Sequence, residues 1–178
     1  MSVTKVNADV FDLTDAYAFS GAVTGAGKIV QVVSEQTGAA ATGTTVMPRD
    51  DSIPQNDEGI EVMTLAITPT NSSNKLLIEV LTFTGFNSDN NSCVALFQDS
   101  TAGALASANT GYAVSTSLPT QNGHIRHFMA AGTTSATTFK VRCGLTTSGT
   151  CTFNGGSGSG LYYGCVMSSS ITIMEIAV

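Results

Sequence analysis

The two histidines, His124 and His127, are the side chains best suited to acid–base chemistry or metal binding near neutral pH. They lie three positions apart in the run HIRHFMA, whose alternation predicts a β-strand with His124, Arg126 and Phe128 on one face. His127 then points to the opposite face, so the pair cannot readily bind one metal ion within a single chain. A ring of identical histidines around a three-fold axis could do so, but a hydrogen-bonded or exposed histidine is the simpler interpretation.

An acidic segment, residues 47–59 (MPRDDSIPQNDEG), carries carboxylates at Asp50, Asp51, Asp57 and Glu58. Clustered carboxylates are the ligands that calcium prefers, but their spacing here matches no EF-hand loop. Two prolines in the same segment exclude a central strand. We therefore expect a solvated surface loop without a metal.

A glycosidase would hold a pair of carboxylates across one cleft, and Glu61, Glu79 and Glu175 are the acids considered because they lie in predicted strands. Glu79 and Glu175 interrupt apolar runs with a period of two, which predicts that both face outward. No serine lies in the G-x-S-x-G pattern of a nucleophile elbow, and no GK[ST] follows the glycines of residues 155–160. The sequence thus predicts a protein that is not an enzyme and uses no cofactor.

The four cysteines, Cys93, Cys143, Cys151 and Cys165, show no paired C-x-x-C spacing of a metal site. Most lie in or next to strand-like runs. We expect buried free thiols that act as small apolar side chains, because disulfides are rare in proteins that fold in the cytoplasm.

Charge and hydrophobicity restrict the class of protein further. Only 11% of the 178 residues are charged, against roughly 25% in a typical soluble protein, which favours burial of weakly polar surface against other copies or a larger assembly. A net charge of −6 with seven scattered Lys and Arg residues argues against nucleic-acid binding. No apolar run approaches the ~20 residues of a membrane span and no signal peptide begins the chain, so we expect folding in the cytoplasm.

Short strand-like runs separated by Thr, Ser, Gly and Asn fill the chain from residue 28 onward, and no comparable helical stretch competes with them. The pattern predicts an all-β protein, an antiparallel β-sandwich. The predicted strands are residues 28–33, 60–68, 75–84, 93–98, 124–130, 137–145 and 170–178. The long polar segment 99–123 between two of them is expected to be an ordered loop, with Tyr112 and Leu118 as anchors.

Two regions follow from this division: an N-terminal arm, residues 1–27, and a β-sandwich knob, residues 28–178. The arm ends in a glycine-rich join and carries apolar side chains that need a surface on which to dock. For attachment to a larger particle we select Val10, Phe11, Leu13, Tyr17 and Phe19. Trp is absent, so Tyr112, Tyr162 and Tyr163 are the loop aromatics that could stack on a receptor sugar.

Several segments, in order, resemble one known family. They are VQVV, then the stretch from EQTGAAATGTTVMPRDD to NKLLIEV, then VALFQDSTAGALA, MAAGTTSATTFKVRCG, TFNGG and SSSITIMEI. Together they are similar to the C-terminal domain of bacteriophage tail-fibre and related virion surface proteins, and the similarity runs through nearly all of residues 28–178. None of these motifs is catalytic.

The resemblance implies a trimeric, jelly-roll-like β-sandwich at the tip or surface of a virus particle, made in the host cytoplasm. The implied partners are further copies of the chain, capsid or tail proteins, and a host surface glycan. A long repetitive fibre shaft is missing, so a capsid decoration or cement protein and a lectin-like module stay open as alternatives, and a depolymerase is disfavoured. For the trimer interface we select His124, Arg126, Phe128, Ile171, Ile173 and Ile176, from two strands that alternate cleanly.

Overall fold

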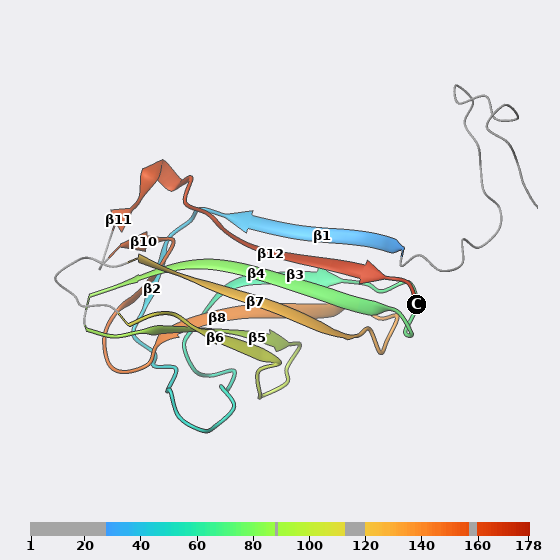
Figure 1. The fold of residues 1–178 in the computed structure, drawn as a ribbon, viewed down its shortest axis with the longest axis horizontal. Coiled ribbons are helices and arrows are strands. Elements are labelled where there is room, and N and C mark those ends of the chain that lie inside the picture. Colours follow the sequence, from blue (N-terminus) through green and yellow to red (C-terminus); the bar gives the residue numbers. More distant parts are fainter. Residues whose placement is uncertain (1–27, 88, 113–119, 157–159) are drawn as a thin grey trace, which may run out of the picture.

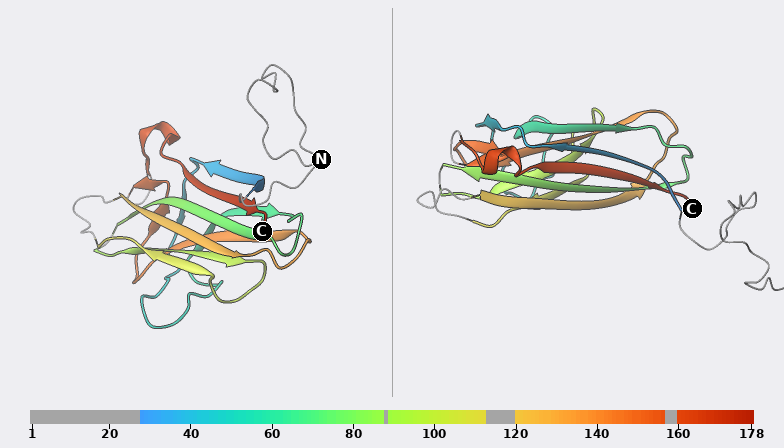
Figure 2. Two further views of the ribbon diagram at one scale, coloured as in Figure 1. Left: turned by 45° about the vertical axis from the view of Figure 1, so that its right-hand side comes forward. Right: turned by 90° about the horizontal axis from the view of Figure 1, so that it is seen from above.

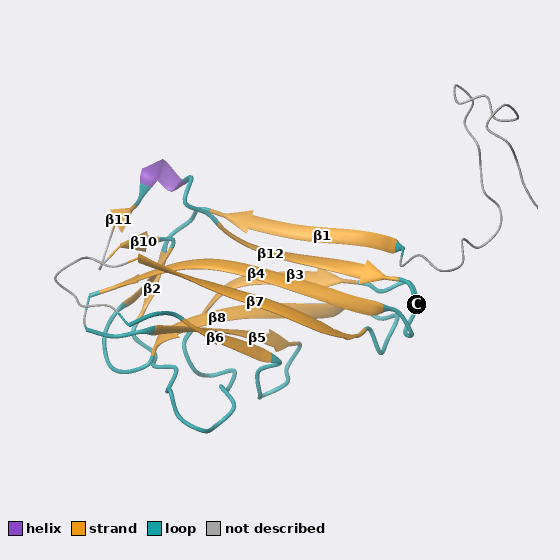
Figure 3. Cartoon of the chain, viewed as in Figure 1, coloured by secondary structure: helices purple, strands orange, loops and turns teal. Residues whose placement is uncertain are grey.

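The computed structural model describes residues 28–87, 89–112, 120–156 and 160–178. Strands make up most of this part of the chain, with a single short 3-10 turn at Tyr163–Cys165 near the C-terminus (Figure 3). The strands are β1 (Ile29–Thr37), β2 (Ala41–Gly43), β3 (Ile60–Ile67), β4 (Lys75–Phe86), β5 (Ser92–Gln98), β6 (Ala106–Asn109), β7 (Thr120–Ala130), β8 (Thr137–Leu145), β9 (Cys151–Phe153), β10 (Gly155–Gly156), β11 (Gly160–Leu161) and β12 (Ser169–Ile176). The prediction of an all-β protein is confirmed.

The strands form two main antiparallel sheets. Neighbouring strands in the first sheet follow the order β1-β12-β4-β7, and the short strands β9 and β2 continue this sheet beyond the end of β12. The second sheet has the order β3-β8-β5-β6. Figure 1 shows the two sheets as layers, with β1, β12 and β4 above β8, β5 and β6.

Apolar side chains from both sheets meet between the layers. Alternation places every second residue of β4, β8 and β12 on this inner face, as the burial pattern of each strand shows. Burying a side chain of this size contributes about 1.5–3 kcal/mol, so the inner face supplies the main stabilisation of the fold. The largest fully buried members are Ile67, Leu76, Ile78, Phe86, Leu96, Phe139, Leu145, Phe153, Ile171 and Ile173.

The two ends of the sandwich differ in what they carry. At one end, Ile29 of β1 pairs with Ile176, which pairs with Lys75 of β4, so the described chain begins and finishes side by side. The connections around β10, β11 and the 3-10 turn lie at the opposite end (Figures 1 and 2). We call these the terminal end and the loop end.

The acidic segment after β2 is a surface loop, as predicted, but it also covers part of the second sheet. Met47 is fully buried against Phe97 on the outer face of β5, and its backbone N–H donates to Leu145. Gly59 closes this loop in the left-handed region (φ +60°), where a Cβ atom would lie 2.6 Å from the carbonyl oxygen of Cys143. Glycine is therefore required there.

Candidate interaction surfaces

The outer face of the first sheet carries a continuous apolar row. The register pairs Val32 of β1 with Met174 of β12, Met174 with Leu77 of β4, and Leu77 with Phe128 of β7. Cross-strand partners share a face, so these four side chains lie next to one another across all four strands. Val32 is 53% exposed and Phe128 is 58% exposed. We call these four residues the outer apolar row.

Neighbouring residues extend the row toward the terminal end and limit it on the other side. Ile29 is exposed and Ile176 is half-buried beside it. On the other side, Glu79 forms an ion pair with Arg126, with 3.6 Å between Oε1 and Nε. A sheet face that meets only water is normally polar, so an apolar row of this length makes this face a candidate interaction surface.

The predicted interface residues divide between this outer face and the core. Exposed His124, Arg126 and Phe128 lie on the outer face, as the alternation of their strand predicts. Ile171 and Ile173 are fully buried between the sheets, so choosing them as surface residues was wrong. Ile176 is half-buried on the outer face.

Sequence reasoning missed Val32, Leu77 and Met174. The signal was present in KLLIEVL, where apolar residues occupy both faces of one strand. Such a run is typical of a strand that is covered on both sides.

Several apolar and aromatic side chains in the connections between strands are exposed. Tyr163 is 80% exposed and Val166 is 79% exposed, while Leu161 and Tyr112 are also exposed. Tyr112 is therefore no anchor for its loop, contrary to the prediction, and Leu118 lies outside the described residues.

Tyr162 differs from its neighbour because it is half-buried against the backbone. A Cβ atom on Gly156 would collide with the Tyr162 ring, so this tyrosine fills the space that the glycine leaves. Tyr163 packs against it edge to face, with 6.3 Å between ring centroids. Tyr163 and Cys165 both have positive φ angles, a conformation that costs roughly 1–3 kcal/mol per residue and that clusters at functional sites.

The residues predicted to attach the protein to a particle, Val10, Phe11, Leu13, Tyr17 and Phe19, lie outside the described residues. The described chain starts at Lys28, at the terminal end. Any attachment made through the preceding 27 residues therefore begins on the side opposite the tyrosines.

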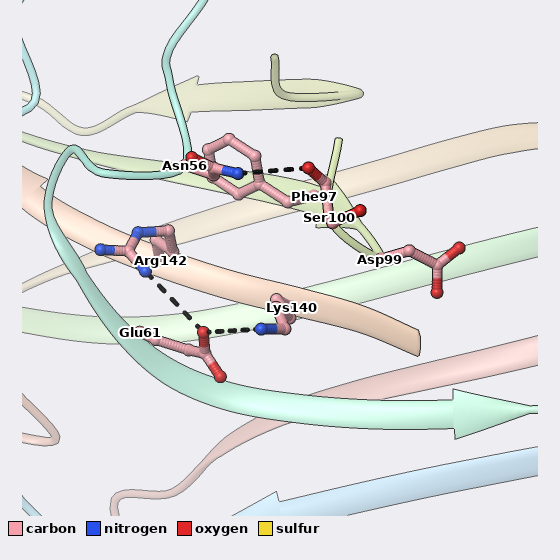
Figure 4. Close-up of a pocket in the computed structure, with 7 residues that line it drawn as sticks. All are labelled: Asn56, Glu61, Phe97, Asp99, Ser100, Lys140 and Arg142. Carbon is pink, nitrogen blue, oxygen red and sulfur yellow. Dashed lines mark hydrogen bonds and ion pairs between the residues drawn. The ribbon is translucent and has the colours of Figure 1, made fainter. Parts of the chain in front are cut away.

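A polar cavity of about 300 Å³ lies on the outer face of the second sheet, lined by Asn56, Glu61, Phe97, Asp99, Ser100, Lys140 and Arg142 (Figure 4). Glu61 Oε2 is 3.3 Å from Lys140 Nζ and 3.8 Å from Arg142 Nη1. Arg142 also donates to the carbonyl oxygens of Glu58 and Gly59 at 2.8 and 2.9 Å. The Arg142 hydrogen bonds thus hold the end of the acidic loop against β8, and the ion pairs of Glu61 join β3 to β8, so these charges have a structural role.

The three acids of the predicted strands do not converge on one cleft. Glu61 lies on the outer face of the second sheet and Glu79 on the outer face of the first. Glu175 is fully buried at the terminal end, so its predicted outward orientation was wrong. Carboxylates in three separate places cannot act as an acid–base pair on one substrate.

Glu175 is held by a ring of donors. Its Oε1 accepts from the N–H and hydroxyl of Thr70 (2.9 and 2.8 Å), from Asn71 N–H (3.3 Å) and from Asn74 Nδ2 (2.6 Å), and its Oε2 accepts from Gln31 Nε2 (2.6 Å). Burial alone would raise the pKa of this carboxyl, but the hydrogen bonds from Asn74, Gln31 and Thr70 outweigh burial and lower the pKa to about 2.

Three of the cysteines are buried free thiols, as predicted, and Cys165 is exposed. Burial, together with the charge of Glu58, raises the pKa of Cys93 to about 11. Within the described residues no three His, Cys, Asp or Glu side chains lie close enough to hold a metal ion. No helix in the same ranges is long and apolar enough to span a membrane.

No protein-family model matches the chain, and no curated protein matches it in sequence.

Proposed function

We propose that this chain is a non-enzymatic structural protein of a bacteriophage virion: a homotrimeric jelly-roll knob, anchored by residues 1–27, that serves as a tail-fibre-type appendage or capsid decoration. The order in which its strands pair carries the proposal. Among the described residues, the strands of four or more residues are β1, β3, β4, β5, β6, β7, β8 and β12. In that order the first pairs with the last, the second with the seventh, the third with the sixth and the fourth with the fifth.

Nested pairing of this kind is what results when one long hairpin of eight strands folds over into two sheets. Alternate pairs of the hairpin then lie in the same sheet. Here β12 next to β4 joins the first and third pairs, and β8 next to β5 joins the second and fourth. Double-sheet jelly rolls with eight strands are typical of viral capsid and lectin domains. The topology thus supports the virion class that the sequence resemblance implies.

The distance between the terminal end and the loop end supports a protein that is attached to a particle at one end and faces the host at the other. The chain enters the sandwich at the terminal end, where an arm would join a capsid or tail protein. Tyr112 and Tyr163 are exposed elsewhere, in the connections between strands, with Tyr163 at the loop end. A knob on a particle surface needs this arrangement, because its outward loops must be free to contact the host.

The outer apolar row supports self-association. Val32 and Phe128 lie on the two edge strands of the sheet, so the row reaches both of its sides. Contact with other copies would remove these side chains from water, and the central part of such interfaces is depleted of charge. We assign this face to the contacts within the trimer.

A lectin-like receptor module is the second candidate. The exposed ring of Tyr163 favours it, because an aromatic ring gives a sugar an apolar face to stack on. A dedicated cement protein would instead use the outer face to clamp neighbouring capsid subunits.

The deciding experiment measures the mass in solution of the full chain and of a version lacking residues 1–27. Each is then tested for binding to purified particles and to host cells, with circular dichroism as the check that both are folded. A trimer that binds capsids only through the arm establishes a decoration or cement role. Cell binding that survives removal of the arm establishes a receptor-binding tip, and a folded monomer in dilute buffer contradicts the trimer.

A further inference from the structure

We propose that Cys143 and Cys151 form a disulfide bond that links the two sheets under oxidising conditions. Cys143 lies on the inner face of β8 in the second sheet. Cys151 opens β9, which pairs with Phe86 of β4 in the first sheet. Their sulfur atoms are 3.8 Å apart and both side chains are buried.

The geometry needs only a local movement to form the bond. A disulfide has a sulfur–sulfur distance of about 2.05 Å, so the two atoms must approach by roughly 1.8 Å. β9 has only three residues, paired with β4 on one side and with β2 on the other, so a small shift of this short strand disturbs few ladder hydrogen bonds. Between the two cysteines the chain completes β8 and makes a short connection, residues 146–150, which already returns Cys151 to Cys143.

The other two cysteines provide contrast within the same chain. Cys93 is buried in the separate cluster with Met47 and Phe97 on the outer face of the second sheet. Cys165 is exposed in the connection before β12. A bond between Cys143 and Cys151 is therefore the cross-link that the fold favours, and any other pairing would require a larger rearrangement.

The reaction is thiol–disulfide exchange with a small disulfide such as oxidised glutathione. One cysteine thiolate attacks a sulfur of the reagent, which breaks the reagent's S–S bond, forms a mixed disulfide and releases one thiol. The second cysteine thiolate then attacks the protein sulfur of that mixed disulfide and releases the second thiol. The protein loses two electrons and two protons, and the reagent gains them.

Burial sets the rate of this exchange. Its contact with Cys151 and its burial raise the pKa of the Cys143 thiol well above the usual value, so little thiolate is present in the closed protein. We expect the bond to form during folding in an oxidising buffer, or slowly through local opening of β9, and to stay reduced where cellular thiols predominate.

The test is peptide mapping of the unaltered protein. The chain is refolded with oxidised glutathione, remaining thiols are alkylated, and chymotrypsin cuts after Phe139, Leu145 and Phe153. The expected product is residues 140–145 joined to residues 146–153, lighter by two hydrogen atoms than the two peptides together and separated by reductant. Alkylation of all four cysteines, or glutathione retained on Cys143 or Cys151, would overturn the proposal.

Two variants sharpen the result. Cys165→Ser removes the exposed thiol and should leave the cross-linked peptide unchanged. We expect oxidation to raise the denaturation midpoint of the unaltered protein, because a disulfide restricts the unfolded chain. Cys151→Ala should abolish both the cross-linked peptide and this rise. A cross-link that survives Cys151→Ala refutes the assignment, and the mapping of the unaltered chain decides the matter if this variant does not fold.

Discussion

Glu175 provides the sharpest test of the fold, because its carboxylate is buried and receives hydrogen bonds from two segments distant in sequence. Residues 70–74 and Gln31 of β1 both donate to it. Replacing Glu175 by Gln keeps the shape but removes the charge and places an amide N–H₂ group opposite one of these donors. The variant should therefore lose stability without creating a cavity.

The magnitude follows from the contacts. A hydrogen bond to a charged group contributes about 1.5–3 kcal/mol and a neutral one about 1 kcal/mol. Weakening the three shorter bonds to Oε1, from the N–H and hydroxyl of Thr70 and from Asn74, therefore costs roughly 1 kcal/mol each. In the variant the new amide N–H₂ group would face the Gln31 amide donor, at a position where the two atoms are now 2.6 Å apart. Leaving these buried donors without an acceptor costs about 1–2 kcal/mol more. We expect Glu175→Gln to lower the free energy of unfolding by roughly 4 kcal/mol at pH 7, a large part of the 5–15 kcal/mol that is usual for a domain.

The control is Glu79→Gln, the same chemical change on the outer face. Glu79 pairs with Arg126 at 3.6 Å, and the Arg126 side chain is 66% exposed. Such surface pairs contribute less than about 1 kcal/mol, so this variant should unfold almost as the unaltered protein does.

Lowering the pH should reduce the difference in free energy of unfolding between the unaltered protein and Glu175→Gln. The pKa of Glu175 is about 2 in the folded chain and 4.5 ordinarily, so in this range the unfolded state binds more protons. The carboxylate therefore stabilises the fold fully above pH 4.5, and this contribution declines as the pH falls toward 2. Urea unfolding followed by circular dichroism at pH 7 and pH 3, at one protein concentration, measures both effects. Equal costs for Glu175→Gln and Glu79→Gln at pH 7, or a gap that acid leaves unchanged, would refute the reasoning.

Three further predictions concern the surfaces and the loop end. Phe128→Glu should shift the mass in solution from oligomer to monomer, whereas Tyr112→Glu, an equally exposed aromatic away from the outer apolar row, should not. Asn154→Ala should cost roughly 3 kcal/mol in urea unfolding, because buried Asn154 donates to Thr37 and Ala39 and accepts from Ser169. Tyr163→Ser should weaken binding to host cells severalfold without changing the melting temperature, and unchanged binding would exclude the ring from recognition.

The long strands could be predicted from the sequence because each is a run of strand length and strand composition, bounded by Thr, Ser, Gly and Asn. All seven predicted runs are strands, with ends that differ by a few residues. The short strands β2, β6, β9, β10 and β11 were missed. β6 is the run ASAN, with little strand propensity of its own, and it exists because β5 supplies its partner.

The orientation of Glu175 shows where residue type misled the prediction. A charged residue in an apolar run was taken to face outward, although the period of two places Glu175 on the same side as Ile171 and Ile173. What the sequence alone could not reveal is that the loop of residues 70–74 folds over the end of the strand and supplies donors. The same strand was assigned the wrong face in the predicted interface. Ile171 and Ile173, which face the core, were chosen, and Met174, which lies on the outer face, was left out.

The position of both described chain ends at one side of the sandwich follows from the pairing. A chain whose first strand lies antiparallel to its last must leave the domain where it entered. The nested order then places the connections β1 to β3, β4 to β5, β6 to β7 and β8 to β12 together at the other end. These connections can lengthen without disturbing the sheets, since loop closure costs little per added residue. Under the proposed function, this topology places the attached side and the host-facing side at opposite ends, so the arm and the tyrosine loops can be tested independently.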